Sequence, residues 1–203
     1  SLAGVTFPAS EATKTTLQLS NGWKGYGGYW GTPYYSLIKG ECIVQGLIKG
    51  NKWGYIATLP DACCPHNRLI FNLNNHQYTS RVDVLPNGQI HWISGGAHHG
   101  WLSLTGIKFV AVPKNVVPLS WYWQPYGWDY GQITYTVQDN VCEVQGLLRG
   151  NTWNHLATLP SDCRPSGREI FNMNNHQYTS RVDVLSNGDI HWITGGHSHG
   201  WLS

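Results

Sequence analysis

The chain contains much of its sequence twice, and this duplication constrains the fold more than any other feature. The run NNHQYTSRVDVL at 74–85 recurs unchanged at 174–185. Residues 41–103 align without a gap to 141–203, and 43 of these 63 positions are identical. An internal repeat of this kind indicates copies of one structural unit. The sequence therefore predicts two modules, one over 8–109 and one over 110–203.

Composition favours strands over helices in both modules. Charged residues make up only 12% of the chain, whereas Gly occurs 24 times and Trp and Tyr 11 times each. Thr and Val are also frequent, and this profile is typical of an all-β extracellular protein. Between the first cysteine and Pro60 or Pro160, alternating residues predict two short strands with a Gly-Asn turn at 50–51 and 150–151.

The turn after the repeated run predicts the register of a β-hairpin. Residues 85–88, Leu-Pro-Asn-Gly, suit a type I turn followed by a left-handed glycine bulge. In that register Val84 faces Ile90. Val82 faces Trp92, so the apolar side chains share one face, whereas a two-residue Asn-Gly turn would mix the faces.

The other face of this hairpin carries a polar trio, with Asp83 directly across from His91 and Arg81 beside them. The same trio recurs as Arg181, Asp183 and His191. Two interpretations stay open, a ligand site and a cross-strand polar network.

The first residues of the chain resemble a segment in its middle. SLAGVTF at 1–7 matches SLTGIKF at 103–109, and the second repeat stops before this segment. We expect residues 1–7 to form a strand that completes the second module. In the alternatives, the strand swaps into a partner molecule, the chain is cut from a longer tandem array, or each unit simply begins with SLxGxxF.

The cysteines recur with the repeat. One pair per repeat has the same separation, which predicts the intra-repeat disulfides Cys42–Cys63 and Cys142–Cys163 and an oxidising compartment. Cys64 is left over because its counterpart is Arg164. It is either a buried thiol or the link of a covalent homodimer.

Two segments rich in aromatic residues and glycine, 23–35 and 121–130, precede the paired cysteines. They share positions such as Tyr26/Tyr126 and Gly27/Gly127. Aromatic residues at this density either cover a sheet as a hydrophobic lid or line a binding surface.

The order of motifs in each repeat, GLIKGxxWxxIATLP, CxP, RVDVxxNGxIxW and GWLSLxGIxF, resembles the β modules that end phage tail fibres and receptor-binding proteins. The resemblance covers 44–109 and 144–203. It implies a β-sandwich (jelly-roll-like) module that attaches to cell-surface glycans. The paired cysteines and the aromatic-glycine segments depart from that pattern and suggest a secreted version.

Several function classes are disfavoured by the sequence. The only carboxylates common to both repeats are Asp83 and Asp183, and Ser80 sits within a predicted strand rather than on the exposed turn of a nucleophile, so we expect no enzyme. Histidines in the loops 95–101 and 195–201 lack a complete ligand set, so we expect no metal or other cofactor. The 13 basic residues are scattered, which disfavours nucleic acid. No apolar stretch suits membrane insertion.

Glycan binding fits the remaining residue types best, because sugars offer hydroxyls to polar side chains and C–H faces to aromatic rings. The sequence predicts a secreted, multivalent lectin with one site per repeat that binds cell-surface glycans or glycoproteins. The chain begins at Ser1 without a signal peptide, as expected of a mature form. The alternative is an extracellular structural or adhesive protein acting through its aromatic-glycine surfaces.

The cluster 74–76 is the sharpest candidate, because two amides and an imidazole are poor strand formers. The indole at 101 is a site residue or a core residue. The predicted site comprises Asn75, His76, Tyr78, Arg81, Asp83, His91, His99 and Trp101 in the first repeat, and Asn175, His176, Tyr178, Arg181, Asp183, His191, His199 and Trp201 in the second.

Overall fold

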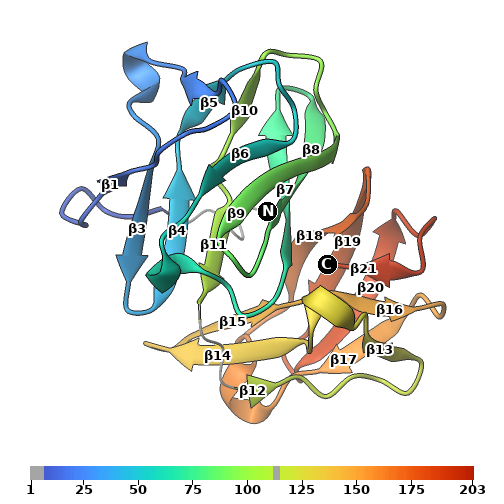
Figure 1. Ribbon diagram of the computed structural model, residues 1–203. Coiled ribbons are helices and arrows are strands. Elements are labelled where there is room, and N and C mark those ends of the chain that lie inside the picture. Colours follow the sequence, from blue (N-terminus) through green and yellow to red (C-terminus); the bar gives the residue numbers. More distant parts are fainter. Residues whose placement is uncertain (1–6, 112–114) are drawn as a thin grey trace. The chain divides into compact units, whose positions relative to one another are not determined.

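The computed structural model describes residues 7–111 and 115–203 (Figure 1). These residues fall into two compact units, which we call the first unit (7–111) and the second unit (115–203). Both units consist of antiparallel strands and single turns of 3-10 helix. The all-β prediction is therefore confirmed. None of the helices in the described ranges is long and apolar enough to cross a membrane.

The first unit contains three antiparallel sheets. One four-stranded sheet has the order β6-β9-β8-β7. It is built from β6 (Tyr55–Thr58), β9 (Gln89–Gly95), β8 (Tyr78–Val84) and β7 (Leu69–Asn75). A second sheet has the order β1-β3-β4-β11, from β1 (Thr15–Thr16), β3 (Tyr34–Ile38), β4 (Glu41–Gln45) and β11 (Ile107–Val110). The third has the order β10-β5-β2, from β10 (Trp101–Ser103), β5 (Leu47–Lys49) and β2 (Lys24–Gly25).

The second unit also contains three sheets. Its four-stranded sheet, β17-β20-β19-β18, is formed by β17 (His155–Thr158), β20 (Asp189–Gly195), β19 (Tyr178–Val184) and β18 (Glu169–Asn175). A three-stranded sheet joins β12 (Asn115–Val116), β14 (Thr134–Gln138) and β15 (Val141–Gln145). The other joins β13 (Trp123–Pro125), β16 (Leu148–Gly150) and β21 (Trp201–Leu202).

The hairpin after the repeated run has the predicted register. Val84 pairs with Ile90, Asp83 with His91, and Val82 with Trp92. A further bulge between Arg81 and Val82, which the sequence did not indicate, shifts the register toward the far end of β8. The second unit repeats the pairing and the bulge.

The core of the first unit draws on different sheets. Val82, Val84 and Ile90 are fully buried and belong to one cluster with Val44 of β4 and Phe109 of β11. Burial of such side chains is the dominant stabilising term in folding. The sheets of this unit are therefore packed around a common apolar interior.

The two predicted disulfides are present and tie a 3-10 turn to a strand in each unit. Cys42 of β4 bonds to Cys63 of η2 (Asp61–Cys63), with their Cα atoms 5.5 Å apart. Cys142 of β15 bonds to Cys163 of η4 (Ser161–Cys163). Cys64 is a free thiol of intermediate exposure.

One local expectation needs correction, and another concerns residues outside the described ranges. The strands on either side of the Gly-Asn turn at 50–51 form, but β5 and β6 belong to different sheets, so this turn does not close a hairpin. The strand predicted for residues 1–7 lies outside the described residues except at Phe7. That residue belongs to no strand and is 70% exposed, whereas its counterpart Phe109 is 1% exposed.

Candidate functional site

The sharpest sequence candidate, Asn74 to His76, lies at the tip of the hairpin between β7 and β8. Asn75 pairs with Tyr78, so only His76 and Gln77 form the turn. His76 has a φ of 63°, and Asn74 holds the turn by donating to the His76 oxygen at 2.7 Å. An asparagine that bonds to the backbone two residues on is typical of turns. The polarity of this cluster therefore has a structural reason.

Asn75 fastens the closing loop, residues 95–101, to the hairpin. Its fully buried amide nitrogen donates to the backbone oxygens of His99, at 3.2 Å, and of Trp101. Its amide oxygen accepts from the His99 backbone nitrogen at 3.3 Å. Asn175 makes the same bonds to His199 and Trp201. The expectation that Asn75 and Asn175 touch a sugar is therefore wrong, because their side chains are enclosed.

Gly96 explains the Gly-Gly pair that opens the closing loop. A Cβ atom on Gly96 would lie 2.6 Å from the Cβ of Tyr78 and 3.1 Å from that of Asn75. Real Cβ atoms do not approach so closely, so only glycine allows the loop to pack on the hairpin. Gly196 has the same contacts with Tyr178 and Asn175.

The packed loop and hairpin gather five aromatic or imidazole rings in the first unit. His76 stacks on His99 with ring centroids 4.8 Å apart, and His99 lies 6.0 Å from Trp101. Tyr78 stacks on His98 at 4.1 Å. Three predicted residues, His76, His99 and Trp101, thus form one cluster, which we call the tip cluster, with Tyr78 at its edge.

The second unit gathers the corresponding tip-cluster rings, but His176 lies edge-on to His199 whereas His76 stacks on His99, and the residues at the edge of the cluster differ. His176 lies 5.0 Å from His199, and His199 lies 5.9 Å from Trp201. Position 198 is Ser, and no ring in the described part of the chain stacks on Tyr178, which is 45% exposed against 38% for Tyr78. His197 packs instead on Trp192, with centroids 5.6 Å apart. The sequence analysis missed the role of His98 as a cover over Tyr78.

The predicted trio on β8 and β9 is an ion-pair network. Asp83 is fully buried and accepts two hydrogen bonds from Arg81, at 2.8 and 2.7 Å, and one from Arg68 at 2.7 Å. Arg81 is itself 8% exposed. The prediction that Arg81 and Asp83 contact a ligand is therefore wrong, and the alternative reading as a polar network holds.

The second unit has the same network around Asp183. Asp183 is buried, and its partners are Arg181 and Arg168. The hydrogen bond from Arg181, followed by the one from Arg168, holds the pKa of Asp183 below its ordinary value despite burial. Asp183 therefore cannot contact a ligand directly, although the Arg181 side chain is 39% exposed.

His91 and His191 lie apart from the tip cluster. His91 contacts Gln89 at 3.2 Å and packs on Tyr55 with ring centroids 5.3 Å apart. Burial, then the charge of Arg68, lowers the pKa of His91. His191 packs on His155 at 5.1 Å. Each histidine lies across from the aspartate of its own trio, and neither belongs to a tip cluster.

The aromatic-glycine segments divide into a buried and an exposed part. Trp23 and Trp123 belong to the cores, a shared position that the sequence analysis missed. The 3-10 turns η1 (Gly28–Trp30) and η3 (Trp128–Tyr130) instead present aromatic rings to solvent. The exposed large side chains of these segments are Tyr26, Tyr29, Trp30, Trp121, Tyr122 and Trp128.

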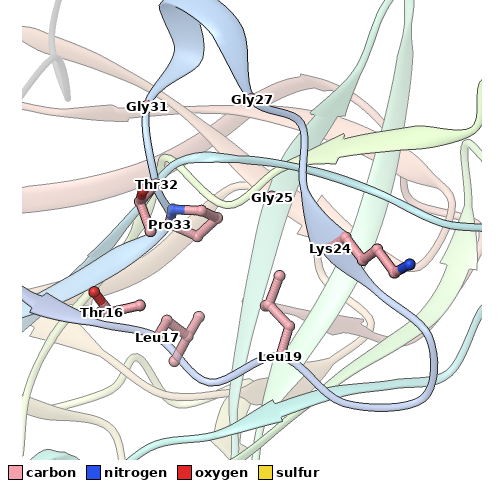
Figure 2. Close-up of a pocket in the computed structure, with 9 residues that line it drawn as sticks. All are labelled: Thr16, Leu17, Leu19, Lys24, Gly25, Gly27, Gly31, Thr32 and Pro33. Carbon is pink, nitrogen blue, oxygen red and sulfur yellow. The ribbon is translucent and has the colours of Figure 1, made fainter.

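A shallow hollow of about 390 Å³ lies beneath the η1 loop of the first unit. Figure 2 shows Leu17 and Leu19 below Pro33 and Gly25, and the Lys24 side chain running away from the other lining residues. None of the site residues predicted from sequence lines the hollow. It is therefore separate from the tip cluster.

Metal ligands do not gather in the described ranges, where no group of three or more His, Cys, Asp or Glu side chains could hold an ion. The tip cluster instead leaves one polar atom without a partner. His99 Nε2 is buried and has no hydrogen-bond partner among the described residues. Buried polar atoms are normally satisfied, so this nitrogen can accept or donate one further hydrogen bond.

No protein-family model matches this chain, and no curated protein or solved structure matches it either. Arguments about its function therefore start from the tip clusters and the exposed aromatic residues.

Proposed function

We propose that the protein is a secreted, non-catalytic lectin with one glycan site per repeat, centred on the tip cluster of each unit. We further propose that each repeat is a β-sandwich of the kind that ends phage tail fibres. Packing of strands from different sheets around one interior supports the sandwich. The two disulfides support an oxidising, extracellular compartment.

One observation carries the glycan proposal. The chain gathers the corresponding three rings twice, His76, His99 and Trp101 in one unit and their counterparts in the other. In each case a buried asparagine fixes the loop that supplies two of the rings. A fixed aromatic surface stacks on the C–H face of a sugar, and rigid side chains lose little entropy on binding.

The polar atoms of the cluster suit hydroxyl ligands. The exposed imidazole of His76 can hydrogen-bond a sugar hydroxyl. This contact requires neither a metal nor a charged ligand.

Two sites in one chain would give avidity. Linked sites make the second binding event intramolecular, which can raise the overall affinity about a hundredfold or more over that of one site. We therefore expect agglutination of glycan-coated cells that one simple sugar inhibits.

A glycan array followed by alanine variants tests the proposal. Replacing His76 and His176 together by Ala should lower the affinity for the best glycan by at least about tenfold, because a stacked ring and a polar contact are lost at each site. His66→Ala is the matched control, since His66 is exposed and lies outside the tip cluster.

A blank array, or equal affinity in the double variant and the control, would contradict the lectin proposal. Unfolding curves of each variant should lie close to that of the wild type, because His76 and His66 are exposed and His176 is only partly buried.

A second candidate, an adhesive extracellular protein, is favoured by the exposed rings of η1 and η3. Tyr29, Trp30 and Trp128 are more than half exposed, and apolar rings at loop tips can mediate protein contacts. Sedimentation separates the candidates. Self-association abolished by Trp30→Ser and Trp128→Ser, together with a blank array, would favour adhesion.

A further inference from the structure

A row of side chains crosses the β10-β5-β2 sheet of the first unit and begins at the tip cluster. Trp101 pairs with Lys49, and Lys49 pairs with Lys24 on the opposite edge of β5. Paired residues on antiparallel strands project from the same face. The next row, Leu102 and Ile48, is fully buried. The face that carries Trp101 and the two lysines is therefore the face turned away from the core.

The row continues beyond Lys24 and Lys49 into the aromatic-glycine segment. Lys49 Nζ lies 5.4 Å from the centre of the Tyr26 ring, and Tyr26 packs edge-on against Trp30 at 6.5 Å. At the other end, Trp101 contacts His99 and His76. One strip thus links two surfaces that the sequence analysis treated separately. We call it the sheet strip, and it comprises His76, His99, Trp101, Lys49, Lys24 and Tyr26.

The charged residues of the sheet strip are both positive. Lys24 and Lys49 are exposed, and like charges directly opposite each other on adjacent strands destabilise a sheet. No carboxylate in the described ranges forms an ion pair with either lysine, whereas Lys108 pairs with Glu41 at 2.8 Å. Two uncompensated cations side by side offer a place for a ligand that brings negative charge.

We propose that the sheet strip binds an acidic polysaccharide, a chain of sugar rings that bear carboxylate or sulfate groups. In the strip two adjacent lysines lie between aromatic rings, which matches a polymer that combines C–H faces with anionic groups. This inference rests on the proposed lectin function and extends it, because the tip cluster holds one sugar ring and the lysines select an acidic neighbour along the polymer.

The second unit provides a natural comparison for the same strip. Trp201 pairs with Arg149, and Arg149 pairs with Gln124, so one of the two cations is replaced by a neutral amide. We therefore expect the first unit to be the stronger site for acidic polysaccharide. Lys24→Gln gives the first strip the residue found in the second, and Gln124→Lys does the reverse.

The experiment measures binding of the full chain to heparin, to polygalacturonate and to neutral dextran, at low and at physiological salt. Lys24→Gln and Lys49→Gln should each weaken binding to the acidic polymers roughly five- to tenfold, because each removes a charge-assisted contact. Lys14→Gln is the matched control. Lys14 also lies over a tyrosine, at 5.3 Å from the Tyr34 ring, but it directly precedes β1, which belongs to another sheet. Lys14→Gln should leave the affinity for the acidic polymers within about twofold, because Lys14 is not part of the row of paired residues that forms the sheet strip.

Gln124→Lys should strengthen binding to the acidic polymers by about the same factor by which Lys24→Gln weakens it. The two acidic polymers separate the sources of charge, because heparin carries sulfates and polygalacturonate only carboxylates.

Equal effects of Lys49→Gln and Lys14→Gln would overturn the inference, because binding would then follow net charge alone. If the chain bound a single-stranded DNA oligonucleotide as tightly as the acidic polysaccharides, the inference would be overturned as well. If neutral glycans bind through His76 while acidic polymers do not bind, the inference fails and the lectin proposal stands. If no glycan of either kind binds, both fail.

Discussion

The side-chain amide of Asn75 donates a hydrogen bond to the backbone oxygen of Trp101, 26 residues further along the chain. This contact joins the tip of the β7–β8 hairpin to the start of β10. It therefore links the β6-β9-β8-β7 sheet to the β10-β5-β2 sheet, which carries Lys24 and Lys49. The tip cluster and the sheet strip both depend on it.

Asn75→Ala should destabilise the first unit by roughly 3 kcal/mol, because it removes the three hydrogen bonds that the fully buried Asn75 amide makes to the backbone of His99 and Trp101. Asn74→Ala is the matched control. Asn74 is exposed in its turn, and its loss should cost about 1 kcal/mol or less. Urea unfolding of both variants checks the difference, and equal midpoints would contradict the fastening role of Asn75.

Gly96→Ala should displace the closing loop, because its new Cβ would meet the Cβ of Tyr78 at 2.6 Å. We expect a loss of about 1–3 kcal/mol in the free energy of unfolding, as for other overpacked positions. Gly100→Ala should be tolerated, since its nearest neighbour is the Gly50 oxygen at 3.7 Å. Thermal unfolding measures stability, and glycan binding should fall in the first variant alone.

The pH dependence of the second unit should reflect Asp183. Its pKa is lowered in the fold, mainly by the hydrogen bond from Arg181, so its ionised form stabilises the folded state above the ordinary pKa of about 4. That contribution disappears as the pH falls through the lower folded value. Asp183→Asn should therefore destabilise strongly at pH 7, and the difference from wild type should shrink progressively below about pH 4.

Calorimetry at several pH values between 7 and 2 measures this difference. Asp162→Asn is the control, because Asp162 is exposed and makes no ion pair with a described residue. If the stability difference between Asp183→Asn and the wild type grew on acidification, the predicted direction of the pH dependence would be wrong.

Cys64 should behave as a poorly reactive thiol. Burial raises its pKa, the Asp61 carboxylate adds to the shift, and the thiol rather than the thiolate predominates at neutral pH. We expect slow alkylation by iodoacetamide at pH 7.4 and a monomer under non-reducing electrophoresis. Cys64→Arg should fold normally, because Arg164 occupies the same position in the second unit and donates to the Leu159 oxygen at 3.1 Å. A covalent dimer that this variant abolishes would refute the prediction.

The sequence by itself determined the duplication, the all-β class, both disulfides and the register of the β8–β9 hairpin. These features follow from local rules. Strand propensity reflects composition, the spacing of Cys42 and Cys63 recurs with the repeat, and Pro86 and Gly88 restrict the turn to one bulged geometry.

Only the tertiary structure decided which polar residues face solvent. Asn75 and His76 are neighbours in sequence, yet the first is enclosed by the closing loop and the second is exposed. Asp83 lies on the face predicted for it, but Arg68, from outside the hairpin, helps to bury it. Lys24 and Lys49 are separated by 25 residues and meet only because β2 pairs with β5. Contacts between distant segments carry no local signature, and for that reason the repeat could be read from the sequence while its surface chemistry could not.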